Sequence, residues 1–144
     1  MKFQCQTSCG GKCCTKAWSK QGTFVFLTKG DRDRLTVHLN QQPDEFAFRA
    51  VFDSTRFTKA KSVQWVLKNS QYQCRFFKNG KCGVYDARPT QCRTFPFWPE
   101  NINENSWDDL KSACPGVDVG KDEPRHSLLK EQVEADKELR KSIV

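Results

Sequence analysis

The chain has 144 residues, which is enough for one domain with a modest core. Apolar residues make up 37% of it and aromatic residues 12%, a composition that argues against wholesale disorder. Eight cysteines and a formal net charge of +7 are the two features that need an explanation.

The positive charge does not by itself predict a nucleic-acid partner. Lysine and arginine are scattered along the chain, with no block of five or six. The charge of +7 also counts every thiol as neutral, whereas metal ligation converts thiols into anionic thiolates. We therefore expect a basic surface that partly offsets anionic metal sites. We expect no nucleic-acid partner, and an unknown protein partner stays open.

The sequence also bears on the compartment and on the state of the cysteines. The first residues lack the apolar core of a signal peptide, and no run of about 18 apolar residues predicts a membrane span. We therefore expect a cytoplasmic protein in a reducing compartment. Dense cysteines there bind metal or carry out redox chemistry more often than they form disulfides. Disulfides stay as the alternative if the chain is exported.

In chain order, the first predicted elements are helices. Thr28 and Asp31 resemble a capping box at a helix start, and Leu35 and Leu39 follow on one face. Pro43 suits the first turn of a second helix. The apolar side of that second helix would consist of Phe46, Phe48, Ala50 and Val51.

Short strands are predicted next, over residues 62–67, 74–77 and 82–85. Asn79-Gly80 between the last two is typical of a hairpin turn. Four further residues predict irregular chain, namely Pro96, Pro99, Asn101 and Asn103.

Two more helices complete the prediction. Pro89 opens a short one that runs through Cys92, and Pro124 opens a final one. The apolar face of the final helix consists of Leu128, Leu129, Val133, Ala135 and Leu139. Its charged surface is compatible with docking on the body or with reaching a partner, and docking is the reading we favour.

These elements predict a small irregular α+β fold that is mostly helical with short strands and is organised around one or more cysteine metal sites. We expect a cysteine-cluster metal-binding domain over residues 1–120 and a charged C-terminal helix over residues 121–144.

The cysteines form two groups. The first is compact and the second is spread over the later part of the chain; they comprise Cys5, Cys9, Cys13 and Cys14, and then Cys74, Cys82, Cys92 and Cys114. Gly10 and Gly11 lie inside the compact group, where they let the backbone wrap closely round an ion or cluster.

The spacing predicts which cysteines share a site. Adjacent side chains in extended chain point to opposite faces, so Cys13 and Cys14 are expected to serve different sites, or one a site and the other the core. Cys74 and Cys82 flank the predicted turn and should converge. The other two later cysteines must arrive by folding. We therefore predict sites that mix ligands from both groups.

All eight cysteines are candidate ligands, and their count leaves the number of sites open. Two four-cysteine sites fit it, and so does a single site with buried spare cysteines. Thiolate ligands suit zinc, iron and a [4Fe–4S] cluster alike. Neither His38 nor His126 has metal-ligand spacing to a cysteine.

Several blocks of residues carry a family resemblance. They are Phe3-x-Cys5-x3-Cys9-Gly10-x2-Cys13-Cys14, then Val25-Phe26-Leu27-Thr28 with Asp31 and Arg34-Leu35, then Cys74-Arg-Phe-Phe77 and Gly80-Lys-Cys82-Gly-Val-Tyr85, then Arg88-Pro89-x2-Cys92-Arg93-x-Phe95-Pro96-Phe97, and Cys114-Pro-Gly116. Over residues 3 to 118 the sequence resembles the YkgJ-type cysteine-cluster family, also called the CxxCxxCC zinc- or iron-chelating domain. The family loop is usually Cys-x2-Cys-Gly-x-Cys-Cys, and this chain has one more residue in each gap.

The resemblance implies metal chelation, with zinc or iron as the metal. Flagellin lysine methylases carry a similar cysteine pattern, which keeps an iron–sulfur cluster open as the alternative. Within the last long block, Arg88 and Arg93 would offset the negative charge of a thiolate site or donate hydrogen bonds to carbonyls around it. The alternative is that both arginines form ordinary surface ion pairs. Phe95, Phe97 and Trp98 would shield the site or pack in an ordinary core.

The sequence thus predicts a metal-binding protein without an assigned molecular role. The alternative is an iron–sulfur protein that acts in electron transfer, in redox sensing or within a methylase-like enzyme system. We find no Gly-rich phosphate loop, no Gly-x-Ser-x-Gly and no histidine-based dyad, so no catalytic residue and no small-molecule substrate is predicted.

Overall fold

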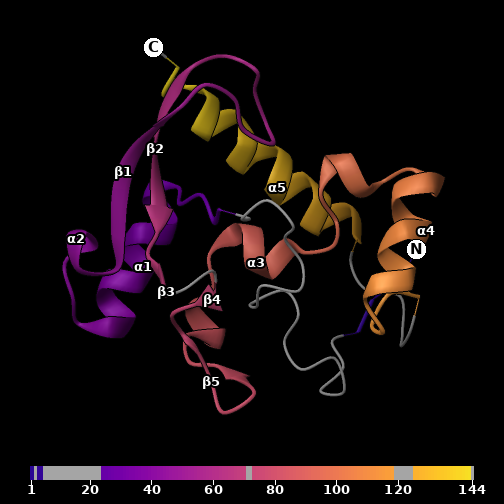
Figure 1. Ribbon diagram of the computed structural model, residues 1–144, viewed down its shortest axis with the longest axis horizontal. Helices are drawn as coiled ribbons and strands as arrows, with labels where there is room; N and C mark the ends of the chain where they lie inside the picture. The colour runs from indigo at the N-terminus through magenta and orange to yellow at the C-terminus, as the bar shows by residue number, and fades with distance from the viewer. Residues whose placement is uncertain (2, 5–23, 71–72, 119–124, 144) are drawn as a thin grey trace.

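The computed structural model of the chain describes residues 1, 3–4, 24–70, 73–118 and 125–143 (Figure 1). Within them lie the α-helices α1 (Lys29–Leu39), α2 (Pro43–Phe46), α3 (Thr90–Thr94), α4 (Glu104–Ala113) and α5 (Arg125–Arg140). The strands are β1 (Ala47–Phe52), β2 (Ser62–Leu67), β3 (Asn69–Ser70), β4 (Gln73–Cys74), β5 (Phe77–Lys78) and β6 (Lys81–Cys82). Two short 3-10 turns are η4 (Tyr85–Ala87) and η5 (Pro99–Asn101). The described part is therefore a small fold of helices and short antiparallel strands, as predicted.

The described core is divided into three apolar clusters. The first apolar cluster consists of Leu27, Leu35, Phe46, Ala47, Leu67, Val84 and Ala87. The second apolar cluster consists of Phe97, Trp107, Cys114 and Val117. The third apolar cluster consists of Phe26, Val66 and Leu139. Because each cluster is small, contacts between the elements that carry them matter for the fold as a whole.

Helix α1 begins with the predicted capping box. The Thr28 hydroxyl accepts from the Asp31 backbone N–H at 3.1 Å, and the Asp31 carboxylate accepts from the Thr28 backbone N–H at 3.0 Å. The helix ends at Asn40, which adopts a left-handed conformation with φ 53°. Leu35 is fully buried and Leu39 packs against the same cluster, which confirms the predicted apolar face.

The prediction of a long second helix from Pro43 is wrong. Helix α2 ends at Phe46, and strand β1 follows it directly. β1 pairs antiparallel with β2 along its whole length, from Ala47 opposite Leu67 to Phe52 opposite Ser62. The apolar spacing of this segment fits both the helical period and the strand period. Pairing with β2 favours the strand, because it satisfies the backbone N–H and C=O groups of both segments.

Strand β2 confirms the strand predicted over residues 62–67, and it is flanked on both edges (Figure 1). One edge of β2 pairs with β1, and the other edge pairs with residues 25–27. The Leu27 N–H donates to the Trp65 carbonyl at 2.9 Å, and the Leu67 N–H donates to the Val25 carbonyl at 3.0 Å. The segment that follows the N-terminal cysteines in sequence is thus fixed to the sheet.

The hairpin predicted around Asn79-Gly80 is present, with shorter strands than expected. Asn79 and Gly80 both have positive φ, 52° and 74°, as a type I′ turn requires. β5 and β6 pair with Phe77 opposite Cys82. Cys74 belongs to β4, which pairs with β3 instead of extending the hairpin. The strand predicted over residues 74–77 is therefore divided into β4, which ends at Cys74, and β5, which begins at Phe77.

Helix α5 spans most of the predicted C-terminal helix and packs on the body (Figure 1). Leu139 is buried in the third apolar cluster, and Leu128 and Leu129 pack against the second. The Gln64 side-chain amide donates to the Leu139 carbonyl at 2.9 Å. The docking that we favoured for this tail is therefore what the structure shows.

Helix α4 was not predicted. It begins after Asn103, whose side chain accepts from the Ser106 N–H at 2.9 Å as an N-cap. Trp107 is buried on its inner side in the second apolar cluster. Among the described helices, none combines the length and the apolar character that a membrane crossing requires.

Candidate metal centre

Four of the eight predicted ligands lie in the described part of the chain. Cys74, Cys82 and Cys92 are partly buried and Cys114 is buried. The other four predicted ligands, Cys5, Cys9, Cys13 and Cys14, lie outside the described residues. No group of three or more His, Cys, Asp or Glu side chains that could hold a metal ion occurs among the residues that the structure describes.

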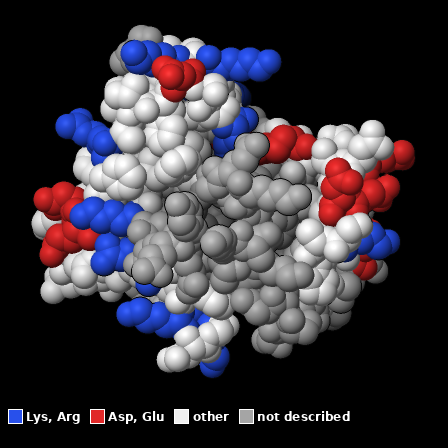
Figure 2. Space-filling view, viewed as in Figure 1, with Lys and Arg blue, Asp and Glu red and all other residues white. Residues whose placement is uncertain are grey.

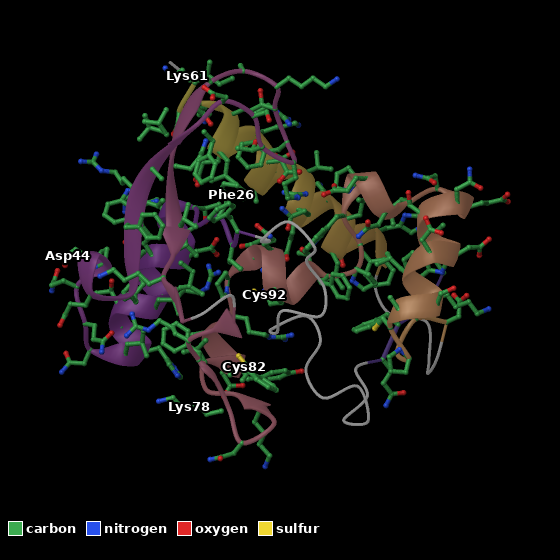
Figure 3. All side chains as sticks on the ribbon, in the orientation of Figure 1. Phe26, Asp44, Lys61, Lys78, Cys82 and Cys92 are labelled. Atoms are coloured by element: carbon green, nitrogen blue, oxygen red, sulfur yellow. The ribbon has the colours of Figure 1, made fainter. Side chains whose placement is uncertain are left out.

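Cys74 and Cys82 pack against the same apolar cluster. Both contact the first apolar cluster, together with Phe76. Cys82 ends β6, and the Gly83 N–H that follows it donates to the Phe76 carbonyl at 2.8 Å. Figure 3 shows Cys82 on the hairpin and Cys92 on α3 above it. Cys82 therefore belongs to the hairpin and Cys74 to the β3–β4 pair, and both pack against one cluster, whereas their convergence as a ligand pair stays a prediction.

Cys92 lies in helix α3, close to the short helix predicted from Pro89. The Cys92 N–H donates to the Pro89 carbonyl at 3.0 Å, which closes the first turn. Pro89 precedes the helix and offers no polar side chain for capping. The first N–H of α3 must therefore find its acceptor elsewhere in the molecule.

That acceptor is Asp31, a fully buried carboxylate. Its Oδ1 accepts from the Thr90 backbone N–H at 2.9 Å and from the Thr90 hydroxyl at 2.8 Å. The Arg34 guanidinium donates to the same oxygen at 2.5 Å and balances its charge. One carboxylate thus caps both α1 and α3. The sequence marks Asp31 as a cap for α1 but carries no signal of its contact with α3, since the two partners are 59 residues apart.

A second polar network holds the far end of α3. The Thr94 hydroxyl donates to the Gln132 side-chain oxygen at 2.6 Å, and the Gln132 amide donates to Asp136 at 2.8 Å. Arg56 donates to both Asp136 and Glu100 at 2.7 Å. All these groups except Glu100 are buried or nearly so, and the network joins α3 to α5.

Burial and hydrogen bonding act in opposite directions on Arg56. Burial of its guanidinium lowers the pKa, whereas the hydrogen bonds that it donates to Glu100 and Asp136 raise it, and the net pKa of Arg56 is raised. The guanidinium also lies over the Trp98 ring, 5.1 Å from the ring centroid. Arg56 therefore stays charged within a largely buried site.

Cys114 lies in the second apolar cluster, at the end of α4. Two residues later, the Gly116 carbonyl accepts from the Gln4 N–H at 3.0 Å. Phe3 pairs with Val117 in the same short ladder. A Cβ atom on Gly116 would lie 2.3 Å from the Gln4 carbonyl oxygen, so only glycine allows the two segments to approach this closely.

Gln91, the residue before Cys92, holds the chain on the other side of the N-terminal cysteine group. Its side-chain oxygen accepts from the Phe26 N–H at 3.1 Å, and its amide donates to the Phe24 carbonyl at 3.0 Å. Gln91 is buried, and its own carbonyl accepts from the Trp98 indole N–H at 3.0 Å. This contact has no signal in the sequence, because a glutamine in a short helix predicts no particular partner.

The arginines next to Cys92 form local surface interactions. Arg88 stacks over the Tyr85 ring at 3.9 Å and donates to the Tyr85 carbonyl at 2.9 Å. Arg93 forms an ion pair with Glu131 of α5 at 2.5 Å. Arg93 therefore forms an ion pair and Arg88 a hydrogen bond to a carbonyl, and a role of either arginine beside a thiolate site stays a prediction.

The aromatic residues that follow Arg93 in the sequence lie in or near the second apolar cluster. Phe97 is fully buried and stacks on Trp107 with 5.7 Å between ring centroids. Phe95 makes edge contacts with both Phe3 and Trp98, at 5.9 and 5.3 Å. Phe97 and Phe95 thus pack in the cluster that contains Cys114, and the shielding of a metal site by these rings stays a prediction.

On the face that Figure 2 shows, the charged side chains of the described residues do not gather in one place. Figure 2 shows lysine and arginine at several separate positions on the face in view, with aspartate and glutamate between them. His38 of α1 and His126 of α5 are exposed.

Comparison with known proteins adds the family. No solved structure matches this chain. A family model matches residues 4–115, which is most of the chain and includes all eight cysteines. That model describes a putative zinc- or iron-chelating domain, in agreement with the resemblance found in the cysteine blocks. The chain therefore belongs to the CxxCxxCC family of zinc- or iron-chelating domains.

Proposed function

We propose that this protein binds zinc or iron through cysteine thiolates that come from both the N-terminal group and the later group. Family membership supports metal binding. The observation that carries the finer proposal is that the structure fixes the chain on both sides of the N-terminal cysteines, in each case beside a later cysteine.

The first fixed point precedes the group. Gln4 is held by Gly116, two residues after Cys114, and Gln4 directly precedes Cys5 in the sequence. Cys5 lies outside the described residues, and its adjacency to Gln4 in the sequence is what supports a shared site with Cys114. We therefore propose that Cys5 and Cys114 belong to one site.

The second fixed point follows the group. Phe24 and Phe26 are held by Gln91, the residue before Cys92. Residues 5–23 thus join two fixed points, and closing them onto the later cysteines costs less entropy than in a chain with loose ends. Cys9, Cys13 and Cys14 can then complete sites with Cys92 and with the pair Cys74 and Cys82.

The donor set fits the metals that the family name gives. Cysteine thiolates are preferred ligands of zinc and of iron–sulfur clusters, and each of the four described cysteines is at least partly buried. Apolar and aromatic neighbours, which three of the four have, limit the access of water to a thiolate site.

The role that we propose for the metal is to join parts of the fold. Cys74 and Cys82 contact the first apolar cluster, whereas Cys114 belongs to the second. Metal ligated by cysteines from both groups would link clusters that are individually small. Bound metal would then contribute directly to folding stability, as structural zinc does in small domains.

Anaerobic purification of the full chain followed by metal and sulfide analysis tests this proposal. We expect the purified chain to contain bound zinc or iron. Removal of the metal with a strong chelator should lower the melting temperature. Cys114→Ser should lower the metal content, whereas Ser112→Ala, two residues away on the exposed side of α4, should leave it unchanged. A wild-type protein that contains and takes up neither metal would contradict the proposal.

The same experiment separates the alternative of an iron–sulfur cluster. A colourless protein with zinc supports simple thiolate sites. A brown protein with iron and an equivalent amount of acid-labile sulfide supports a [4Fe–4S] or related cluster and with it a redox role.

A further inference from the structure

We propose that Asp31 is a positioning residue for the metal centre, because it fixes the turn of α3 that carries Cys92. This inference rests on the proposed function, since it assumes that Cys92 is a ligand. It assigns to a carboxylate outside the cysteine blocks a defined effect on metal affinity.

Helix α3 depends on its surroundings for order. It has five residues, whereas isolated helices shorter than about 12 residues are marginal in water. Its first turn closes on the Pro89 carbonyl, which accepts from both Cys92 and Arg93 at 3.0 Å. The Thr90 N–H in this turn is held by Asp31 at 2.9 Å. The position of the Cys92 backbone therefore depends on a contact with α1.

Asp31 holds more than one group in that turn. It also accepts from the Thr90 hydroxyl at 2.8 Å, so the backbone N–H and the hydroxyl of Thr90 both donate to the same carboxylate oxygen. Gln91 lies between Thr90 and Cys92 and anchors the chain that follows the N-terminal cysteines. A shift of this turn would move Cys92 and that anchor together.

The carboxylate has a fixed place because its own contacts are saturated. Asp31 is fully buried, and its oxygens accept four hydrogen bonds, from the Thr28 N–H, the two Thr90 donors and Arg34. An amide in place of the carboxylate has only one acceptor oxygen and brings two donors into a site that is already lined with donors. Asp31→Asn should therefore loosen the joint between α1 and α3 with little change in volume.

The test compares Asp31→Asn with Asp33→Asn in the full-length protein. Asp33 lies in the same helix, but its side chain is 63% exposed and pairs with Lys29. The affinity for zinc is measured by competition with a chromophoric chelator, and the thiolate charge-transfer spectrum is recorded after cobalt substitution. We expect Asp31→Asn to lose about tenfold or more in zinc affinity, the range seen when groups that orient metal ligands are removed. Asp33→Asn should bind as the wild type does.

Circular dichroism and urea unfolding separate positioning from a general loss of structure. A folded Asp31→Asn protein with a weakened or altered cobalt spectrum supports positioning, and one with wild-type affinity and spectrum overturns it while leaving the proposed function intact. If Asp31→Asn does not fold, Thr90→Val decides, because it removes only the hydroxyl donor. Weakened binding by folded Thr90→Val, restored in Thr90→Ser, supports the proposal, and unchanged binding overturns it. A wild-type protein that binds neither zinc, cobalt nor iron overturns the proposed function and the positioning role together, and one that binds only iron has its Asp31→Asn variant compared by iron content and visible spectrum instead.

Discussion

Asp31 and Thr90 are 59 residues apart in sequence, and the carboxylate of the first accepts both the backbone N–H and the hydroxyl of the second. This contact joins the start of α1 to the start of α3. It gives two helices, one long and one very short, a common cap. The stability of the joint should therefore respond to changes at either residue.

Thr90→Val tests the hydroxyl part of this contact. The substitution keeps shape and volume but removes a donor from a buried carboxylate, so we expect a loss of about 1–3 kcal/mol in the free energy of unfolding. Thr90→Ser keeps the donor and should recover most of the loss. Urea unfolding measures both variants, and a Val variant as stable as the wild type would show that the hydroxyl contributes nothing.

Gly116→Ala tests the ladder between the N-terminus and the end of α4. The added methyl would lie 2.3 Å from the Gln4 carbonyl oxygen and 2.9 Å from the Phe3 ring. The backbone must then separate, and we expect a loss of about 1–3 kcal/mol together with a lower metal content.

Gly30→Ala in α1 is the matched control for this added methyl. The nearest atoms lie at 3.5 and 3.8 Å, in the side chains of Arg34 and Thr28. A helical alanine should stabilise the protein by up to about 1 kcal/mol. Thermal unfolding and metal analysis of both glycine variants provide the comparison, and equal effects would refute the role of the close approach at Gly116.

Arg56→Met tests the buried ion network between the loop after β1 and α5. Asp136, whose side chain is only 6% exposed, would lose its cation. Leaving a buried charge without its partner costs about 3–5 kcal/mol, and we expect destabilisation near the lower end because Gln132 still donates to Asp136.

Glu100→Gln removes the other carboxylate from Arg56. Its side chain is 39% exposed, so solvent screens the pair and we expect less than about 1 kcal/mol. Denaturant unfolding of the two variants side by side checks the ranking. A larger effect at Glu100 than at Arg56 would contradict it.

The pH dependence of Asp33 tests the surface pair in α1. The hydrogen bond from Lys29 lowers the pKa of Asp33 below its usual 3.8, and the attraction of Lys29 adds to this. A carboxyl with a lowered folded-state pKa stabilises the protein above its unfolded pKa, and this contribution is lost as the pH falls through the folded-state value. NMR titration should show the pKa below 3.8 and its return toward 3.8 in Lys29→Met. An unchanged pKa in that variant would show that Lys29 is not the cause.

A helix cap and a hairpin turn could be predicted from the sequence, because each depends on residues that are neighbours in the chain. The capping box of Thr28 and Asp31 and the turn at Asn79-Gly80 are set by neighbouring residues, and both are present. The segment after Pro43 was predicted as a helix because its apolar spacing fits either period. It forms a strand because β2, which lies later in the chain, pairs with it.

In the candidate site too, features set by nearby residues could be predicted and contacts between distant residues could not. The pairing of Cys74 and Cys82 with one cluster could be anticipated from the hairpin between them. The contacts of Gln91 with Phe24 and Phe26 span 67 and 65 residues, respectively, and leave no periodic pattern in the sequence. Asn103 did carry a usable signal for α4, since an Asn before an acidic first turn and buried Trp107 is a standard helix start.

The position of α5 has a practical consequence for anyone who joins this chain to another protein or shortens it. The family match ends at residue 115, which suggests a natural place to cut. Yet the carbonyls of Leu139 and Ser142 accept hydrogen bonds from Gln64 and Val63 of β2. A chain cut after residue 115 would lose the carbonyls that accept these hydrogen bonds from β2. The end of the family match is therefore not a safe place to truncate the protein.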